Sequence, residues 1–305
     1  MFPGTLSVPV SADEARGPRR APVRGPVTIY PLAARHEPEV LDYLSRRPLH
    51  TVFLRGFIRD NGLVSALNRG IFFCCRDAAG RLAGVALIGH ATLFEVSAEA
   101  ALRAFAETAQ CHGSIHMIMG ERPSVERFWG YYAPHGQEPR RACREVLMEL
   151  GHRVESDVEA DGLRLADLGD LPQVMEAQAL MAFEESGVDP READPAGFER
   201  RCARRIERGR VWVMREGSEL VFKADVMSET PEVAYLEGVY VNPSCRGRGL
   251  GLACMARLSE ELLERVGSLC LLVNERNVSA LTFYRAAGFV ARGGYDTVFL
   301  KPKGR

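Results

Sequence analysis

The sequence has little that would tie the protein to a membrane or to a polyanion. No apolar run approaches the about 18 residues that span a bilayer, and the N-terminus lacks the apolar core of a signal peptide. Lysine and arginine (39) nearly balance aspartate and glutamate (40), which leaves a formal net charge of −1. Such a chain has no general field to attract nucleic acid or an anionic surface. We therefore expect a cytoplasmic protein that binds neither a membrane nor nucleic acid.

Cysteine and histidine give no sign of a metal or a disulfide framework. The eight cysteines have no CxxC spacing, and we expect reduced thiols in a chain of this length without a signal. Cys111, His112 and His116 lie close in sequence but lack a second ligand pair, so no metal site is expected. No histidine follows His152. If catalysis uses only the second half of the chain, its base cannot be histidine.

Length and composition predict two folded parts behind a tail. A chain of 305 residues is typical of two domains. Residues 1–26 contain five prolines and no periodic apolar pattern, which predicts a flexible tail. A boundary is expected near Gly151, dividing the rest into residues 27–152 (the first half) and 153–305 (the second half).

The two halves share a sequence pattern. Residues 70–76 and 82–88 read as a hairpin, and residues 209–215 and 220–226 repeat that hairpin at a nearly constant offset. Gly120-Glu121-Arg122 followed by Phe128 also resembles Asn274-Glu275-Arg276 followed by Phe283. We interpret this as a diverged internal duplication, although two α+β domains can look alike at this level.

A strand, a glycine loop and a helix start follow one another in the second half. The β-branched and aromatic run at 235–241 stops at Asn242-Pro243, and a helical pattern opens at Leu250. Between them lies Arg246-x-x-Gly249-x-Gly251, which matches neither the Rossmann spacing nor the P-loop. Glycines let backbone N–H groups point inward, and a helix N-terminus attracts phosphate. The loop is therefore a candidate anion site.

A second motif gives this loop a family context. Residues 273–289 read Val-Asn-Glu-Arg-Asn-Val-Ser-Ala-Leu-Thr-Phe-Tyr-Arg-Ala-Ala-Gly-Phe. The loop and this segment, in this order, closely resemble the pyrophosphate loop (Q/R)-x-x-G-x-(G/A) and the N-x-x-A-x-x-x-Y-x-x-x-G-F helix of the GNAT superfamily of acyl-CoA-dependent N-acyltransferases. The resemblance covers roughly residues 162–301 and is sharpest over 237–289.

The resemblance implies a fold and a cofactor. The fold is α/β with two tandem GNAT-like domains, each a mixed central sheet flanked by helices. The cofactor is acetyl-CoA. By resemblance the strand edge of Val239, Tyr240 and Val241 pairs with the pantetheine. The pyrophosphate is held by the backbone of the loop, which comprises Arg246, Gly247, Arg248, Gly249, Leu250 and Gly251.

The same resemblance suggests roles for four side chains. Asn277 stands where a helix N-cap belongs and where the family contacts the cofactor, and Asn274 is a weaker candidate for a polar contact. Tyr284 is the family's general acid, unless it is simply a packed core tyrosine. Glu237 stands where many members carry a catalytic carboxylate. Alternation predicts that it shares a strand face with Val239 and Val241, and a structural pairing with an arginine remains the alternative.

The acceptor site is defined less sharply. In the family, the segment joining the first two helices walls the acceptor pocket, and here residues 183–195 carry five carboxylates, among them Glu184 and Glu185. These favour a cationic amine, either a small molecule or a peptide N-terminus, unless they form only a solvated loop. The first half has Ser97-Ala98-Glu99-Ala100 where its loop would be. We expect it to be degenerate and to bind acetyl-CoA poorly.

The implied activity is acetyl transfer to a primary amine by direct attack on the thioester. Two alternatives stay open. One is a catalytically idle module that senses or binds acyl-CoA. The other is a protein-directed acetyltransferase whose first half docks the partner.

Overall fold

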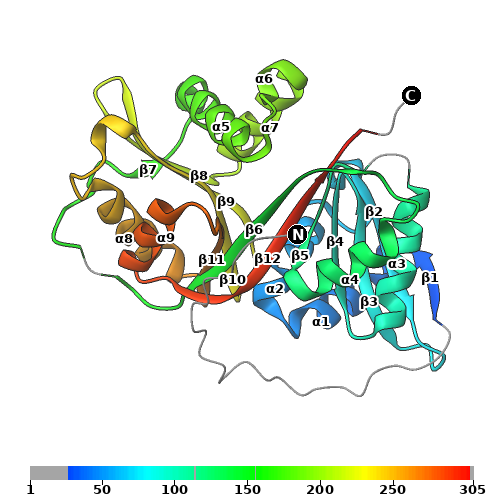
Figure 1. Ribbon diagram of the computed structural model, residues 1–305. Helices are drawn as coiled ribbons and strands as arrows, with labels where there is room; N and C mark the ends of the chain where they lie inside the picture. Colours follow the sequence, from blue (N-terminus) through cyan, green and yellow to red (C-terminus); the bar gives the residue numbers. More distant parts are fainter. Residues whose placement is uncertain (1–26, 113–114, 155, 303–305) are drawn as a thin grey trace.

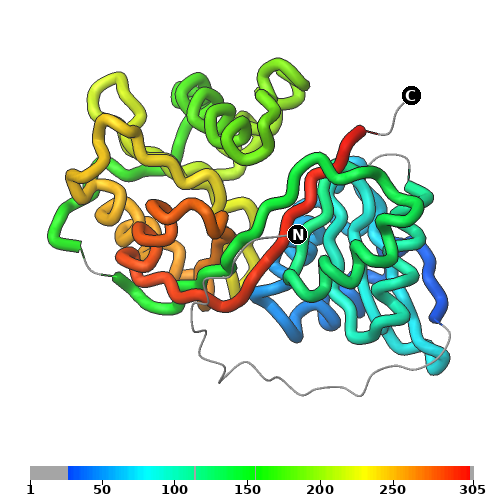
Figure 2. Tube along the Cα trace, in the orientation of Figure 1, coloured from blue at the N-terminus to red at the C-terminus, as the bar shows by residue number. Residues whose placement is uncertain are grey.

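The computed structural model describes residues 27–112, 115–154 and 156–302. Within them, twelve strands form one mixed sheet with helices on both of its faces (Figure 1, Figure 2). The predicted α/β class is therefore confirmed. The tail expected at residues 1–26 lies outside the described residues.

The first half supplies six strands and four helices of the described chain. In order they are β1 (Thr28–Pro31), α1 (Glu37–Ser45), α2 (Pro48–Asn61), β2 (Gly70–Arg76), β3 (Leu82–Gly89), β4 (Ala91–Val96), α3 (Glu99–Cys111), β5 (Met117–Glu121), α4 (Arg122–Tyr132) and β6 (Pro139–Leu150). All eight residues of β3 are buried, because helices cover both faces of the sheet at that strand.

The second half repeats this order of elements. It contains β7 (Arg164–Leu165), α5 (Leu171–Ser186), α6 (Pro190–Ala193), α7 (Pro195–Glu207), β8 (Val211–Glu216), β9 (Glu219–Glu229), β10 (Val233–Val241), α8 (Leu250–Leu263), β11 (Ser268–Asn274), α9 (Val278–Ala286) and β12 (Val290–Leu300). Both predicted hairpins are present, as β2–β3 and β8–β9. The helices expected at 37–45 and from Leu250 onward also form.

The strand order is symmetrical about a central pair. It runs β1-β2-β3-β4-β5-β12-β6-β11-β10-β9-β8-β7. Outward from β12 and from β6, the first neighbour is antiparallel, the next pairing is parallel, and the rest are antiparallel. This symmetry supports the interpretation of a duplication.

The central strands are exchanged between the halves. Strand β12 pairs with β5 and β6, both from the first half, and β6 pairs with β11 and β12, both from the second half. Figure 1 shows β6 and β12 as long neighbouring strands that run from one half into the other. The boundary expected near Gly151 falls directly after β6 and stays a prediction. Nothing in the local sequence indicated the exchange.

Helices divide between the faces in the same way in each half. On one face α1 and α2 cover the first half, and α5 and α7 cover the second. On the other face, α3 and α4 cover the first half, and α8 and α9 cover the second.

Helix α2 also crosses the junction. A Cβ on its Gly56 would lie 2.1 Å from the hydroxyl oxygen of Ser228 in β9, so only glycine allows this approach. Two ion pairs reinforce the contact: Arg55 Nη2 lies 2.8 Å from Glu232 Oε2, and Arg210 Nη2 lies 2.6 Å from Asp60 Oδ1. No helix in the described part of the chain has the length and apolar composition needed to cross a membrane.

We predict that residues 153–305 do not fold cooperatively when produced alone. Without the first half, β12 loses both neighbours and β11 gains an open edge, which favours aggregation. Urea unfolding followed by circular dichroism should give one transition for the intact chain and none for this fragment. Mixing it with residues 1–152 should restore the transition. Independent cooperative unfolding of both fragments would contradict the prediction.

Candidate functional site

The glycine loop and the start of α8 form an open anion-binding geometry. Strand β10 ends at Val241, and Asn242 then closes a short turn by accepting a hydrogen bond from the Ser244 N–H at 3.1 Å. Gly247 and Gly249 both have φ of +77°, a left-handed conformation that favours glycine. No side chain caps α8 at Gly249. The first amides of the helix are therefore free to bind an anion.

A groove of about 720 Å³ begins at this loop. Among the residues singled out from the sequence, its lining includes Glu184, Val239, Tyr240, Val241, Arg246, Gly247, Gly249, Gly251, Asn277 and Tyr284. The structure thus brings together segments that are up to 100 residues apart (184 to 284). A Cβ on Gly251 would lie 3.0 Å from Val241 Cγ2 and 3.1 Å from Phe283 Cε2, so a side chain there would narrow the groove.

Three candidates from the loop and the motifs do not line the groove. Arg248 instead forms an ion pair with Glu216 at 3.1 Å, and Leu250 is buried against the core under α8. The Asn274 side chain accepts a hydrogen bond from the Arg276 N–H at 2.9 Å and shapes the turn after β11. Backbone amides in the loop remain available whichever way these side chains point.

Asn277 and Tyr284 lie on α9, at the far wall of the groove. The Asn277 carboxamide oxygen accepts a hydrogen bond from the Ala280 N–H at 3.0 Å, which makes it the expected N-cap. The Tyr284 ring packs edge-on against Phe283 and Phe289. Burial raises the pKa of the Tyr284 hydroxyl well above its usual value. No hydrogen bond to this hydroxyl is present within the described residues, and Tyr284 is one of the residues that line the groove.

The prediction that Glu237 shares a strand face with Val239 and Val241 is wrong. Strand β10 carries a bulge: Glu237 is opposite Asp225, whereas Tyr240 is opposite Lys223, so two residues of β10 face one of β9. The extra residue shifts the alternation. Val239 and Val241 pack toward α8, whereas Glu237 lies on the opposite face with Asp225. Glu237 is not among the residues that line the groove.

The Glu237 side chain has no partner of its own among the described residues. It is partly buried and has no hydrogen bond or ion pair within the described residues, so the arginine pairing considered above does not form. Burial raises the pKa of its carboxyl, and the nearby cations Arg205 and Lys223 lower it part of the way. Pairing of β10 with β11 is limited to Val233–Tyr235 and Ser268–Cys270. Beyond that point, no ladder separates the face of Glu237 from the face of the groove.

Two further carboxylates lie near Glu237. Burial raises the pKa of Glu145, on β6, to about 7, although a hydrogen bond from Thr297 (2.6 Å) lowers it in part. Surrounding protein atoms and then the charges of Glu237 and Glu145 raise the pKa of Glu185, although the residue is exposed at the surface. Glu185 was a sequence candidate, but Glu145 was not. No local pattern marks Glu145, because its strand partners, Asn274 and Tyr295, lie far along the chain.

The two aspartates of segment 183–195 are paired locally and cap α6 and α7. Asp189 pairs with Arg191 at 2.7 Å and Asp194 pairs with Arg201 at 2.8 Å. Only Glu184, which lines the groove, and Glu185 are placed near the candidate site.

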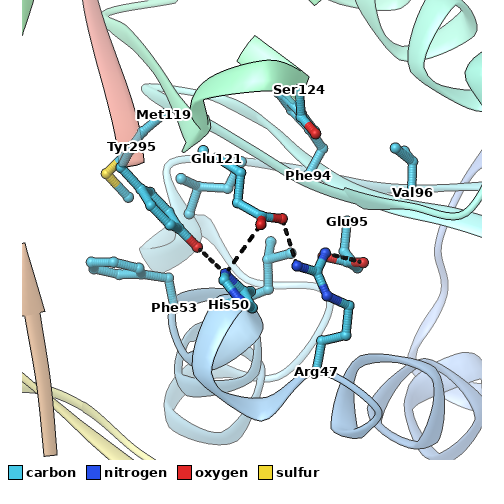
Figure 3. A pocket seen from close by; sticks show the side chains of 13 residues that line it. Arg47, His50, Phe53, Phe94, Glu95, Val96, Met119, Glu121, Ser124 and Tyr295 are labelled. Carbon is cyan, nitrogen blue, oxygen red and sulfur yellow. Dashed lines mark hydrogen bonds and ion pairs between the residues drawn. The ribbon is translucent and has the colours of Figure 1, made fainter. Parts of the chain in front are cut away.

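In the first half, the place that corresponds to the divergence of β10 and β11 is occupied by a cluster of ion pairs. Strands β4 and β5 also pair only at their starts, Ala91–Met117 and Thr92–Ile118. Where they diverge, the Arg47 guanidinium donates to Glu95 at 3.0 Å and to Glu121 at 2.7 Å (Figure 3). The cavity left beside this cluster is about 40 Å³. It is far too small for a nucleotide cofactor, which supports the expected degeneracy.

Comparison with known proteins defines the second half. Residues 174–289 match the family model of the acetyltransferase (GNAT) family. These residues form a GNAT-family domain. The match spans the groove, the glycine loop and α9. No curated protein gave a significant match to the chain.

Solved structures extend the likeness of fold over both halves. An acetyltransferase of the GNAT family from Colwellia psychrerythraea is 14% identical with a TM-score of 0.54, covering 90% of this chain and 100% of that one. A tandem GNAT protein of the clavulanic acid biosynthesis pathway is 14% identical with a TM-score of 0.54, covering 92% and 99%. A GCN5-related N-acetyltransferase from Sphaerobacter thermophilus is 16% identical with a TM-score of 0.52, covering 90% and 95%. The tandem GNAT architecture is thereby confirmed.

Glu145 generates a prediction about stability and pH. Its carboxyl is 9% exposed and its pKa is raised to about 7, so its ionised form is disfavoured in the folded state. Its contribution to stability is complete below about pH 4 and is lost as pH rises toward 7. Glu145→Gln keeps an acceptor for Thr297 and removes the charge.

At pH 8 we expect Glu145→Gln to be more stable than the wild type by on the order of 2 kcal/mol, and at pH 5 the difference should shrink. Urea midpoints at both values measure this. Glu107→Gln, on the exposed face of α3, controls for loss of a surface charge. A Glu145→Gln protein that is less stable at pH 8 than the wild type would refute the assignment.

Proposed function

We propose that this protein is an acetyl-CoA-dependent N-acetyltransferase that modifies a cationic primary amine, with catalysis in residues 153–305. The observation that carries the proposal is the single groove joining the uncapped start of α8 to the Tyr284 hydroxyl. Its anion site suits a pyrophosphate, and the glycine cradle leaves room that a side chain at position 251 would fill. The groove is also long enough to run from β10 to α9.

The residues fit the needs of acetyl transfer. When bound, acetyl-CoA supplies a thioester whose carbonyl carbon the amine attacks as the C–S bond breaks. The Tyr284 hydroxyl, protonated at neutral pH, donates a proton toward the departing sulfur. Glu237 takes up the proton that the amine must lose, directly or through water. A carboxylate whose pKa is raised by burial is better matched to that task than an ordinary one.

The charge around Glu237 supports a cationic acceptor. Glu145 and Glu185 lie close enough to Glu237 to influence its electrostatic surroundings, and all three carboxyls have raised pKa values. An ammonium group entering among them would relieve the repulsion and favour their ionised forms. This arrangement suits a small amine or a peptide N-terminus with a further positive charge.

Calorimetric titration with acetyl-CoA tests cofactor binding and its stoichiometry. We expect one site per chain, because Arg47 and its partners fill the corresponding place in the first half. Gly249→Val and Gly251→Val should weaken binding at least about tenfold, because of positive φ at Gly249 and steric contact at Gly251. Gly217→Val, at an equally left-handed but open turn, is the matched control. Two sites would contradict the degeneracy of the first half.

Turnover with a panel of amines tests the chemistry. Tyr284→Phe and Glu237→Gln should each lower kcat by about 100-fold with little change in the KM for acetyl-CoA. Glu237→Gln should also remove the acid limb of the pH profile. Tyr131→Phe, which removes a remote hydroxyl on α4, should leave kcat unchanged. Binding of acetyl-CoA without turnover of any amine would favour an idle acyl-CoA-binding module instead.

A further inference from the structure

A lysine with no exposed surface lies beneath the bulge of β10. Lys223, on β9, is 0% exposed. Its ammonium group lies 2.7 Å from Asp225 Oδ1, 2.9 Å from Gln178 Oε1 and 3.2 Å from the Gly238 carbonyl oxygen. Lys223 donates hydrogen bonds to Gln178 and Gly238 and forms an ion pair with Asp225, whose Oδ1 receives no hydrogen bond within the described residues. Burying a charge this completely is unfavourable unless such partners are present.

The bulge brings Gly238 close to the Lys223 ammonium group. Gly238 has a φ of +61°, and it is one of the two residues of β10, between Glu237 and Tyr240, that face a single residue of β9. A Cβ on Gly238 would lie 2.7 Å from Lys223 Nζ and 2.9 Å from Gln178 Oε1. A side chain at position 238 would therefore force the Lys223 ammonium group or the Gln178 side chain to shift, and the positive φ would strain it as well.

We propose that Lys223 is a positioning residue for acetyl transfer, because by holding the Gly238 carbonyl it fixes the bulge that sends Glu237 and Val239 to opposite faces of the sheet. The inference rests on the proposed function. The peptide unit between Gly238 and Val239 is planar, so its N–H points away from its C=O and hence away from Lys223. Val239 lines the groove. Its N–H is thereby kept out of the Lys223 network on the side where a thioester carbonyl needs a donor.

Lys223 is also one of three charged groups that act on the Glu237 carboxyl. Arg205, on α7, donates to Asp225 Oδ2 at 2.8 Å, so Lys223 and Arg205 share one carboxylate. These two cations and Asp225 leave one positive charge, which an ionised Glu237 balances. Arg205 lowers the pKa of Glu237 and Lys223 lowers it to a smaller extent, whereas Asp225 raises it. Glu145 and Glu185 lie near Glu237. Without Lys223, Glu237 would hold its proton to higher pH.

The test compares Lys223→Met with two other variants of the full-length protein. Lys223→Met keeps the length of the side chain and removes its charge and donors, while Asp225 retains Arg205. Gly238→Ala keeps the charges and breaks the same contact from the other side. Arg55→Met is the matched control, because Arg55 is a similarly buried cation whose partner, Glu232, precedes β10 at the end remote from the bulge.

We expect Lys223→Met to lower kcat about 30-fold or more with little change in the KM for acetyl-CoA, since the loss is that of an aligned donor and base. The acid limb of its pH profile should move to higher pH. Gly238→Ala should lower kcat without that move. By hydrogen exchange, the amides of residues 238–240 should exchange about tenfold faster in both variants. Arg55→Met should lose stability and change none of these.

The outcomes separate this inference from the function on which it rests. A wild-type protein that releases no CoA thiol with any amine overturns both. An active wild type whose Lys223→Met variant keeps its kcat, its acid limb and its exchange at 238–240 overturns the inference alone. If Lys223→Met fails to fold, Gly238→Ala decides: an unchanged kcat and unchanged exchange at the bulge would overturn the inference.

Discussion

The pairing of β6 with β12 is the contact on which the rest of the molecule depends. Each strand comes from one half and is flanked by strands of the other, so neither half completes its sheet without its partner. The first half therefore has a structural role in completing the sheet. It covers the edge of β11 and places Glu145 on the side of the sheet where Glu237 lies.

The exchange works in both directions. As the first half sends Glu145 toward the groove-bearing half, the second half sends Tyr295 on β12 into the cluster of the first. There the Tyr295 hydroxyl lies 2.8 Å from His50 Nδ1 (Figure 3). The two strand pairs that diverge, β4–β5 and β10–β11, differ in what lies between their strands. One is closed by Arg47 and two glutamates, and the other is left open beside a loop of glycines. A direct ion pair and a groove cannot occupy the same gap.

The open pair shows how one inserted residue organises chemistry. In a regular strand, Glu237, Val239 and Val241 would face the same way. The bulge places Glu237 with Lys223 and Asp225 on one face, and Val239 and Val241 beside the groove on the other. The bulge thereby separates the Glu237 side chain from the groove-lining side of β10. A buried lysine holding a glycine carbonyl is a strong way to keep that geometry, because neither partner tolerates a change in the other.

The sequence by itself determined the α/β class, the repeated order of elements, the glycine loop with its helix, and the capping of α9 by Asn277. Each of these depends on residues that are neighbours in the chain, so spacing and residue type are enough to predict them. It did not reveal the exchange of β6 and β12, because strand partners more than 100 residues apart leave no local pattern. Nor did it place Glu237 correctly, since a bulge changes alternation through its pairing with β9. The charged pair Lys223-x-Asp225 stands out within an apolar strand. Only the tertiary structure buries both residues and brings the Lys223 ammonium group to the Gly238 carbonyl oxygen.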